Sequence, residues 1–182
     1  MEINIRRATL NDASLLSQLS TITFLDTFRG TCTDEEIEKF VVDCFSTGKI
    51  YKELQDENDF YFIAFINSIA VGYIRMKEEE SDVTEIKKYR AIELKRIYVL
   101  KEYHSKKAGA ALMKFALEFA DKNNYEAMFL GVWEHNERAK AFYKRWGFTD
   151  TYSTHNFPIG NTPQTDIWLI KLIGDRVTNF ST

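Results

Sequence analysis

The stretch E-L-K-R-I-Y-V-L-K-E-Y-H-S-K-K-A-G-A-A-L-M, residues 93–113, decides how the rest of the chain is interpreted. Apolar residues at positions 92 and 94, and again at 97 and 99, predict a strand, but the step from 94 to 97 contains one residue too many. An extra residue near Lys95 or Arg96 predicts a β-bulge. A bulge bends a strand away from its neighbour, so backbone N–H and C=O groups become free.

A helix is expected directly after this strand. Ser105 can cap it, and the apolar pattern continues to about Asn123. Its start contains four small residues in succession, namely Ala108, Gly109, Ala110 and Ala111. Free N–H groups and the helix dipole favour an anion such as pyrophosphate there. Lys106 and Lys107 can help to hold phosphates, although lysines at a helix start oppose the dipole. Many helices with such a start bind nothing.

The N-terminal third predicts one strand and three helices. The strand is expected at residues 3–7, and a helix begins at Asn11 or Asp12. The aromatic run 24–30 leaves the helical pattern, and it either lines a substrate pocket or packs under a loop. Thr33 and Glu36 fit a capping box that opens a second helix. A third, short helix is expected at residues 49–55.

The remaining segments predict a sheet with one parallel strand pair. Residues 59–66 and 69–76 form a hairpin around Asn67-Ser68, followed by the charged loop 78–82, which is either solvated or a rim that attracts cations. Residues 127–132 follow a helix and therefore run parallel to the bulged strand. A cleft between these two strands would open at their C-terminal ends, where ligands commonly bind. Asn136 caps a further helix that stops at Gly147, and two strands, 148–155 and 165–172, end the sheet.

Composition limits the class of protein. A chain of 182 residues with 45% hydrophobic residues fits one domain, expected at residues 1–173, with a polar tail at 174–182. A net charge of −3 argues against nucleic-acid binding, and no apolar run approaches the roughly 20 residues that cross a bilayer. The N-terminus does not resemble a signal peptide. Cys32 and Cys44 lack metal-ligand spacing and are expected to be free thiols in the cytoplasm.

Two segments carry a family resemblance. The run N-E-R-A-K-A-F-Y-K-R-W-G-F, residues 136–148, resembles the second motif of the GNAT superfamily of N-acetyltransferases, Asn-x-x-Ala-x-x-Phe-Tyr-x-x-x-Gly-Phe, at every marker position. The segment His104-x-x-Lys107-x-Gly109 is similar to that superfamily's acyl-CoA motif, Gln/Arg-x-x-Gly-x-Gly/Ala. It departs at two of three positions, and Lys107 must hold a backbone shape that Gly adopts more readily. The chain looks most like the PaiA-type polyamine N-acetyltransferases.

The resemblance implies a fold, a co-substrate and a set of site residues. The fold would be α/β, a mixed and mostly antiparallel sheet with a splayed parallel pair, flanked by helices. Acetyl-CoA would be the co-substrate, with no metal. The implied CoA-binding residues are Ile97, Tyr98, Val99, His104, Ser105, Lys106, Lys107, Ala108, Gly109, Ala110, Ala111, Asn136, Ala139, Phe142 and Tyr143. The acceptor would be a small amine such as spermidine or spermine, bound near Phe28, Glu93, Trp133 and His135, in a monomer or homodimer.

The implied reaction is attack of a neutral amine on the acetyl thioester. Tyr143 is the expected general acid for the CoA thiolate, although the same residue on an apolar helical face could be a core aromatic. An aliphatic amine is mostly protonated at pH 7, so a base is needed. Glu93, His135 or a water chain that ends on either could serve. Two alternatives stay open: an enzyme of this fold that modifies a protein N-terminus or lysine, and a CoA-binding regulator without chemistry.

Overall fold

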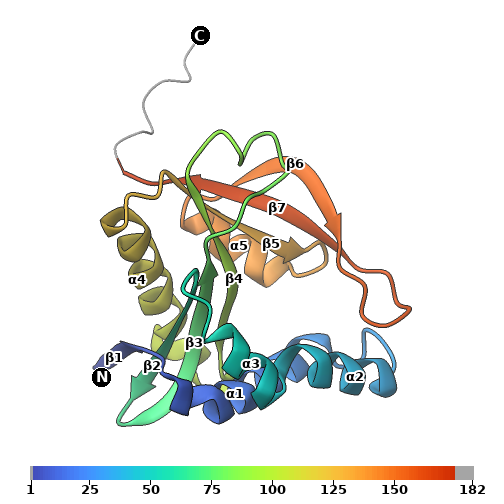
Figure 1. Ribbon diagram of the computed structural model, residues 1–182. Coiled ribbons are helices and arrows are strands. Elements are labelled where there is room, and N and C mark those ends of the chain that lie inside the picture. The colour runs from blue at the N-terminus through green and yellow to red at the C-terminus, as the bar shows by residue number, and fades with distance from the viewer. Residues whose placement is uncertain (1, 175–182) are drawn as a thin grey trace.

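The computed structural model describes residues 2–174, and residues 175–182 of the expected polar tail lie outside this range. Seven strands form one sheet in the order β1-β2-β3-β4-β5-β7-β6 (Figure 1). The strands are β1 (Ile3–Arg7), β2 (Asp59–Ile66), β3 (Ile69–Lys77), β4 (Ala91–Val99), β5 (Ala127–Trp133), β6 (Thr149–Asn156) and β7 (Thr165–Leu172). Only β4 and β5 pair in parallel, and the other neighbours are antiparallel. The predicted fold class is confirmed.

Helices cover both faces of this sheet. The α-helices are α1 (Ala13–Phe28), α2 (Asp34–Phe45), α3 (Thr47–Glu53), α4 (Ala108–Lys122) and α5 (Glu137–Arg145), with 3-10 turns η1 (Leu10–Asp12) and η2 (Lys101–Lys106). Figure 1 shows α1, α2 and α3 together along the lower side of the view and α4 apart from them at the left. The order of elements along the chain agrees with the prediction.

Two hydrophobic clusters on opposite faces of the sheet explain this arrangement. Leu112 and Met113 of α4 pack in one cluster with Ile74 of β3 and Leu94 of β4, and the half-buried aromatic residues of α5 pack against the same cluster. On the other face, Leu16 and Leu19 of α1 and Ile50 of α3 pack in a cluster with Tyr61, Ile63 and Tyr73. Neighbouring residues of a strand point to opposite faces, so the predominantly apolar β2 and β3 contribute to both clusters.

A buried ionic network connects helix α3 to strands β2 and β3. Arg75 of β3 donates to Asp59 of β2, at 2.9 and 2.6 Å, and lies 3.1 Å from Glu53 of α3. Glu53 also accepts a 2.6 Å hydrogen bond from the hydroxyl of Tyr61. Buried charges need partners of opposite sign because water no longer solvates them. The network therefore holds α3 against β2 and β3 in one position.

Local predictions were mostly confirmed, with two corrections. The turn at Asn67-Ser68 has positive φ at both residues, 49° and 64°. Thr33 and Glu36 form the capping box that opens α2. However, α1 continues through Phe28 instead of ending near Phe24, because its aromatic residues pack on α2 in a third cluster. Ser105 does not cap α4, because residues 101–106 form a 3-10 turn and the α-helix begins at Ala108.

Candidate active site

The parallel pair β4–β5 opens into a splay at the centre of the sheet. Its register covers only Ala91 to Glu93 of β4, paired with Ala127 to Phe129 of β5, although β4 continues to Val99 and β5 to Trp133. The bulge that the sequence predicts lies at the point of separation. Met76 of β3 pairs with Leu94 while Arg75 pairs with Arg96, so Lys95 is the extra residue.

The start of α4 lies beside the end of β4 and is suited to an anion. Lys107 precedes the helix in the left-handed region, with φ 62° and ψ 11°, at a cost of about 1–2 kcal/mol for a residue with a side chain. It thus adopts the shape that Gly gives more readily in the related motif. The Ala111 N–H donates to the Lys107 carbonyl at 3.0 Å. The amides of 108, 109 and 110 are those that an α-helix leaves without an intrahelical acceptor.

The second motif builds α5 and places Tyr143. Asn136 caps the helix by accepting a 3.0 Å hydrogen bond from the Ala139 N–H, and Gly147 follows the helix with φ 80°. Tyr143 is half-buried, 5.8 Å from Phe148 between ring centroids, and its hydroxyl has no hydrogen-bond partner within residues 2–174. Burial, and then the charge of Asp166, raise the pKa of Tyr143. The phenol is therefore protonated at neutral pH, as a proton donor must be.

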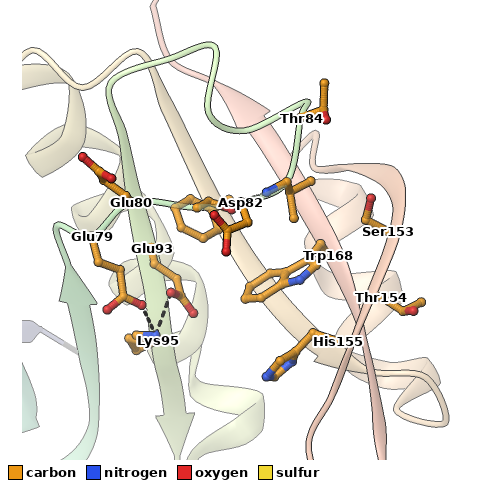
Figure 2. A pocket seen from close by; sticks show the side chains of 13 residues that line it. Glu79, Glu80, Asp82, Thr84, Glu93, Lys95, Ser153, Thr154, His155 and Trp168 are labelled. Carbon is orange, nitrogen blue, oxygen red and sulfur yellow. Dashed lines mark hydrogen bonds and ion pairs between the residues drawn. The ribbon is translucent and has the colours of Figure 1, made fainter.

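A pocket of about 620 Å³ lies over the sheet on the face opposite α4 (Figure 2). The β3–β4 loop forms one wall, strands β4, β5 and β7 form the floor, and the middle of β6 forms the other wall. We call it the acidic pocket because four carboxylates line it beside a single lysine. Its lining residues are Glu79, Glu80, Ser81, Asp82, Val83, Thr84, Glu93, Lys95, Phe129, Ser153, Thr154, His155 and Trp168.

Glu93 lies at the base of the acidic pocket. It is only 6% exposed, and the ammonium group of Lys95 lies 2.7 Å from its carboxylate and also contacts Glu79 (Figure 2). Burial and the hydrogen bond with Glu79 raise the pKa of Glu93 to about 7. At Glu79, partial burial acts to raise the pKa of the carboxyl group. Hydrogen bonds with Glu93 and Lys95 nevertheless lower that pKa below its ordinary value. A carboxylate whose pKa is raised toward neutral is a candidate for a general base.

The other expected substrate residues lie together, but outside the acidic pocket. Phe28 is 5% exposed and packs at 5.4 Å from Trp133 within the cluster that joins α1, α2 and the β6–β7 loop. His135 is exposed, and its ring meets Trp133 edge-on at 5.4 Å. The indole N–H of Trp133 is buried without a hydrogen-bond partner among the described residues. Phe28 thus packs under the loop, which is the second of the two roles considered for its segment.

Sequence reasoning missed three pocket-face residues, Asp166, Trp168 and His155. They belong to the two C-terminal strands, where they alternate with core residues such as Ile167 and Leu169. Asp166 pairs directly with His155 on one side and with Trp133 on the other. The signal in the sequence was a carboxylate on the same strand face as an aromatic residue. It could not be interpreted without knowing which strand lies next to β5.

Within residues 2–174 no helix is long and apolar enough to cross a membrane, and no three His, Cys, Asp or Glu side chains gather as metal ligands. Cys32 and Cys44 are both free thiols.

Known proteins resemble this chain in sequence and in structure. The sequence signature of the Acetyltransferase (GNAT) family matches residues 24–148. An uncharacterized N-acetyltransferase of Lactobacillus delbrueckii is 31% identical over 85% of this chain and 88% of its own length. A spermidine N(1)-acetyltransferase of Thermoplasma acidophilum is 29% identical over 81% and 89%. The crystal structure of the PaiA N-acetyltransferase of T. acidophilum with coenzyme A superposes with a TM-score of 0.75, at 23% identity, over 94% of this chain and 99% of that one.

A mixed sheet whose parallel pair separates after Glu93, beside the start of α4, agrees with the fold of that acetyltransferase structure. The chain belongs to the Acetyltransferase (GNAT) family. It is an acetyl-CoA-dependent N-acetyltransferase, and acetyl-CoA supplies the activated acetyl thioester.

Proposed function

We propose that the acceptor is a polyamine, with spermidine or spermine as representative substrates. The observation that carries the proposal is the charge of the acidic pocket. Glu79, Glu80, Asp82 and Glu93 line it, and Lys95 is the only basic side chain among its 13 lining residues apart from His155. Glu80 and Asp82 have no ion-pair partner in residues 2–174, so two carboxylates stay available for ammonium groups.

Aromatic residues add to this affinity for cations. Trp168 forms part of the pocket floor, 5.7 Å from Phe129, with the His155 ring 5.2 Å away (Figure 2). An ammonium group over an indole face gains about 0.5–2 kcal/mol. A chain of methylenes that separates two ammonium groups can pack on such a surface while each charge meets a carboxylate. The Thermoplasma relative named as a spermidine N(1)-acetyltransferase supports this class of acceptor.

The residues present fit acetyl-CoA on the opposite side of the splay. We propose that residues 104–111, at and before the start of α4, hold the pyrophosphate, because free helix-start amides bind anions and the charges of Lys106 and Lys107 would add to this attraction. A Cβ added at Gly109 would meet only Val99 Cγ2, at 3.9 Å, so the backbone there is open to a ligand. Residues 97–99 of β4, past the bulge, would pair with the extended arm of the co-substrate. Asn136, Ala139, Phe142 and Tyr143 would border it from α5.

Two side chains carry the proposed chemistry from the two sides of the splay. Tyr143 would donate its proton to the departing sulfur. Because the pKa of Tyr143 is raised, this transfer needs a thiolate that is poorly solvated as it forms. Glu93 has two candidate roles, as the base for the ammonium group and as its counter-ion in the acidic pocket. His135 is a further candidate base, because it lies beside Trp133 at the end of β5.

A thiol-release assay with acetyl-CoA and a panel of amines tests the acceptor. The panel contains spermidine, spermine, n-butylamine and a peptide with a free N-terminus. We expect kcat/KM to be highest for the polyamines, and KM for spermidine to fall at low salt. Replacing Glu80 and Asp82 together by Gln and Asn should raise KM for spermidine several-fold. Glu118→Gln, on the exposed side of α4, is the control.

The acceptor proposal fails if kcat/KM for spermidine does not exceed that for n-butylamine. A peptide that exceeds both would assign the enzyme to protein modification instead. Absence of turnover with every amine, while CoA still binds, would favour a regulator.

A further inference from the structure

We propose that Asp166 is the general base of this enzyme, and that Glu93 instead binds a cationic group of the acceptor. The inference rests on the acetyltransferase function stated above and deepens the account of the same site. It starts from where the Asp166 carboxylate lies relative to the splay.

Asp166 leans across β5 toward the opening between β4 and β5. In the β5–β7 register Asp166 lies opposite Trp133, and Trp168 lies opposite Gly131. A Cβ built on Gly131 would nevertheless lie 3.0 Å from Asp166 Oδ2. The carboxylate is therefore displaced diagonally and rests over the Gly131 backbone. Gly131 is the second residue after Phe129, where the pairing with β4 ends, so the carboxylate borders the splay itself.

The charge of Asp166 acts on the groups that surround the reaction centre. It raises the pKa of Tyr143 on α5 and, with smaller weight than burial and Tyr73, that of Tyr98 on β4. Burial is the larger cause at Tyr143, and the charge of Asp166 adds to it from a neighbouring strand. Glu93, in contrast, is held by the Lys95 ammonium group at 2.7 Å and by its hydrogen bond with Glu79. The base takes its proton from the acceptor nitrogen and the acid gives its proton to the departing sulfur, and both atoms are bound to the same carbonyl carbon during the reaction.

The Asp166 carboxylate is also uncommitted. No hydrogen-bond donor or counter-ion reaches it from the residues that the structure describes, and the residue is half-buried. The ionisable groups that face it are Tyr98 on β4, Tyr143 on α5 and His155 on β6, while β5 contributes the uncharged Gly131 and Trp133. Burial raises the pKa of Asp166 to about 6, and burial and Lys95 lower that of His155. A partly buried carboxylate without a partner lowers stability, and such groups are frequent at functional sites.

The acceptor nitrogen loses two protons in the reaction. Asp166 accepts the first from the ammonium group and passes it to solvent, which frees the lone pair for the carbonyl carbon. The C–N bond forms as the C–S bond breaks, and Tyr143 gives its proton to the sulfur. The second proton of the nitrogen, strongly acidic once the C–N bond has formed, leaves to solvent, and Tyr143 regains its proton from solvent, so one proton is released net per turnover.

Two acceptors separate a base from a residue that merely supports the site. Spermidine is protonated at pH 7 and needs a base, while 2,2,2-trifluoroethylamine is already largely neutral. With Asp166→Asn we expect kcat for spermidine to fall about 10²-fold, kcat for trifluoroethylamine to fall less than about 3-fold, and KM for acetyl-CoA to stay unchanged. The wild-type loss of kcat below pH about 6 should disappear in the variant. n-Butylamine replaces spermidine if polyamines are not acetylated, so failure of the acceptor proposal is distinguishable.

Three further variants complete the test. Gly131→Ala keeps Asp166 but places a Cβ against its carboxylate. We therefore expect the same selective loss of kcat for spermidine. Glu93→Gln should raise KM for spermidine with kcat within about 3-fold. Asp150→Asn, an exposed carboxylate on β6, is the control and should change neither. Equal losses on both amines in Asp166→Asn, or a selective loss in Glu93→Gln instead, would overturn the assignment.

Discussion

The imidazole of His104 bonds the last residue of the bulged strand, with 2.8 Å between its Nε2 and the carbonyl oxygen of Val99. Because a carbonyl oxygen only accepts, Nε2 carries the proton. This bond ties the 3-10 turn before α4 to the end of β4. His104 stands where the related motif has Gln or Arg, and it provides one N–H donor as either of those would.

His104→Ala should therefore loosen the turn and weaken acetyl-CoA binding. We expect a three- to tenfold higher KM for acetyl-CoA, about 0.7–1.4 kcal/mol, which is typical for loss of one hydrogen bond, with kcat nearly unchanged. His104→Gln, whose amide can donate to the same oxygen, should retain most of the affinity. Steady-state kinetics at saturating amine check both variants. Equal effects of Ala and Gln would show that the Val99 contact does not matter.

Gly109→Glu should abolish acetyl-CoA binding while the fold persists. Gly109 lies in the first turn of α4, and its added Cβ has only Val99 Cγ2 near it, at 3.9 Å. The longer side chain would therefore occupy the proposed phosphate site and repel its charge. Isothermal titration calorimetry with CoA and thermal unfolding measure the two properties separately. Gly109→Ala is the matched control and should bind CoA. If the Glu variant binds CoA normally, the pyrophosphate lies elsewhere.

Tyr143→Phe should affect the rate and little else. The Tyr143 hydroxyl has no hydrogen-bond partner within residues 2–174, so stability should change little, and the ring still packs against Phe148. We expect kcat to fall by about 10²-fold, roughly 2.7 kcal/mol, without a change in acetyl-CoA affinity, because the proton is needed only as the thiolate leaves. Tyr51→Phe, on exposed α3, is the control. Unchanged kcat in an assay limited by chemistry would make Tyr143 a packing residue only.

Glu36 should make the β6–β7 loop sensitive to acid. Its carboxylate accepts from the backbone N–H groups of Thr33 and Asn161, at 3.1 and 2.8 Å, and these bonds lower its pKa to about 2. Since folding lowers this pKa from 4.5, the contribution to stability is complete above pH 4.5 and disappears as the pH falls through about 2. The difference in Tm between wild type and Glu36→Gln should shrink over that range.

Glu38→Gln, exposed on the same helix, should show no such pH-dependent difference. A Tm difference between wild type and Glu36→Gln that stays constant from pH 7 to pH 2 would contradict the assignment of these hydrogen bonds to Glu36.

Much of the local structure around β4, α4 and α5 was predictable because its signals are local. The misplaced apolar alternation marked the bulge at Lys95, and the left-handed residue at Lys107 followed from a motif position that prefers glycine. The Asn136 side chain accepts from the N–H of Ala139, only three residues further on, so this helix cap could be predicted from the sequence alone. Such features depend on residues within one turn or one strand, where backbone geometry restricts the choices.

The acceptor side was decided only by the tertiary structure. The sequence alone determined a mixed sheet, the order of its elements and the bulge in β4, since these follow from periodicity and short motifs. It could not place Asp166 over Gly131, 35 positions away, because strand β7 inserts between β5 and β6. Nor could it show that Glu79 and Lys95 bind Glu93. Those contacts and the pKa changes they cause depend on which strands become neighbours and on how much water burial removes, and both are properties of the folded chain as a whole.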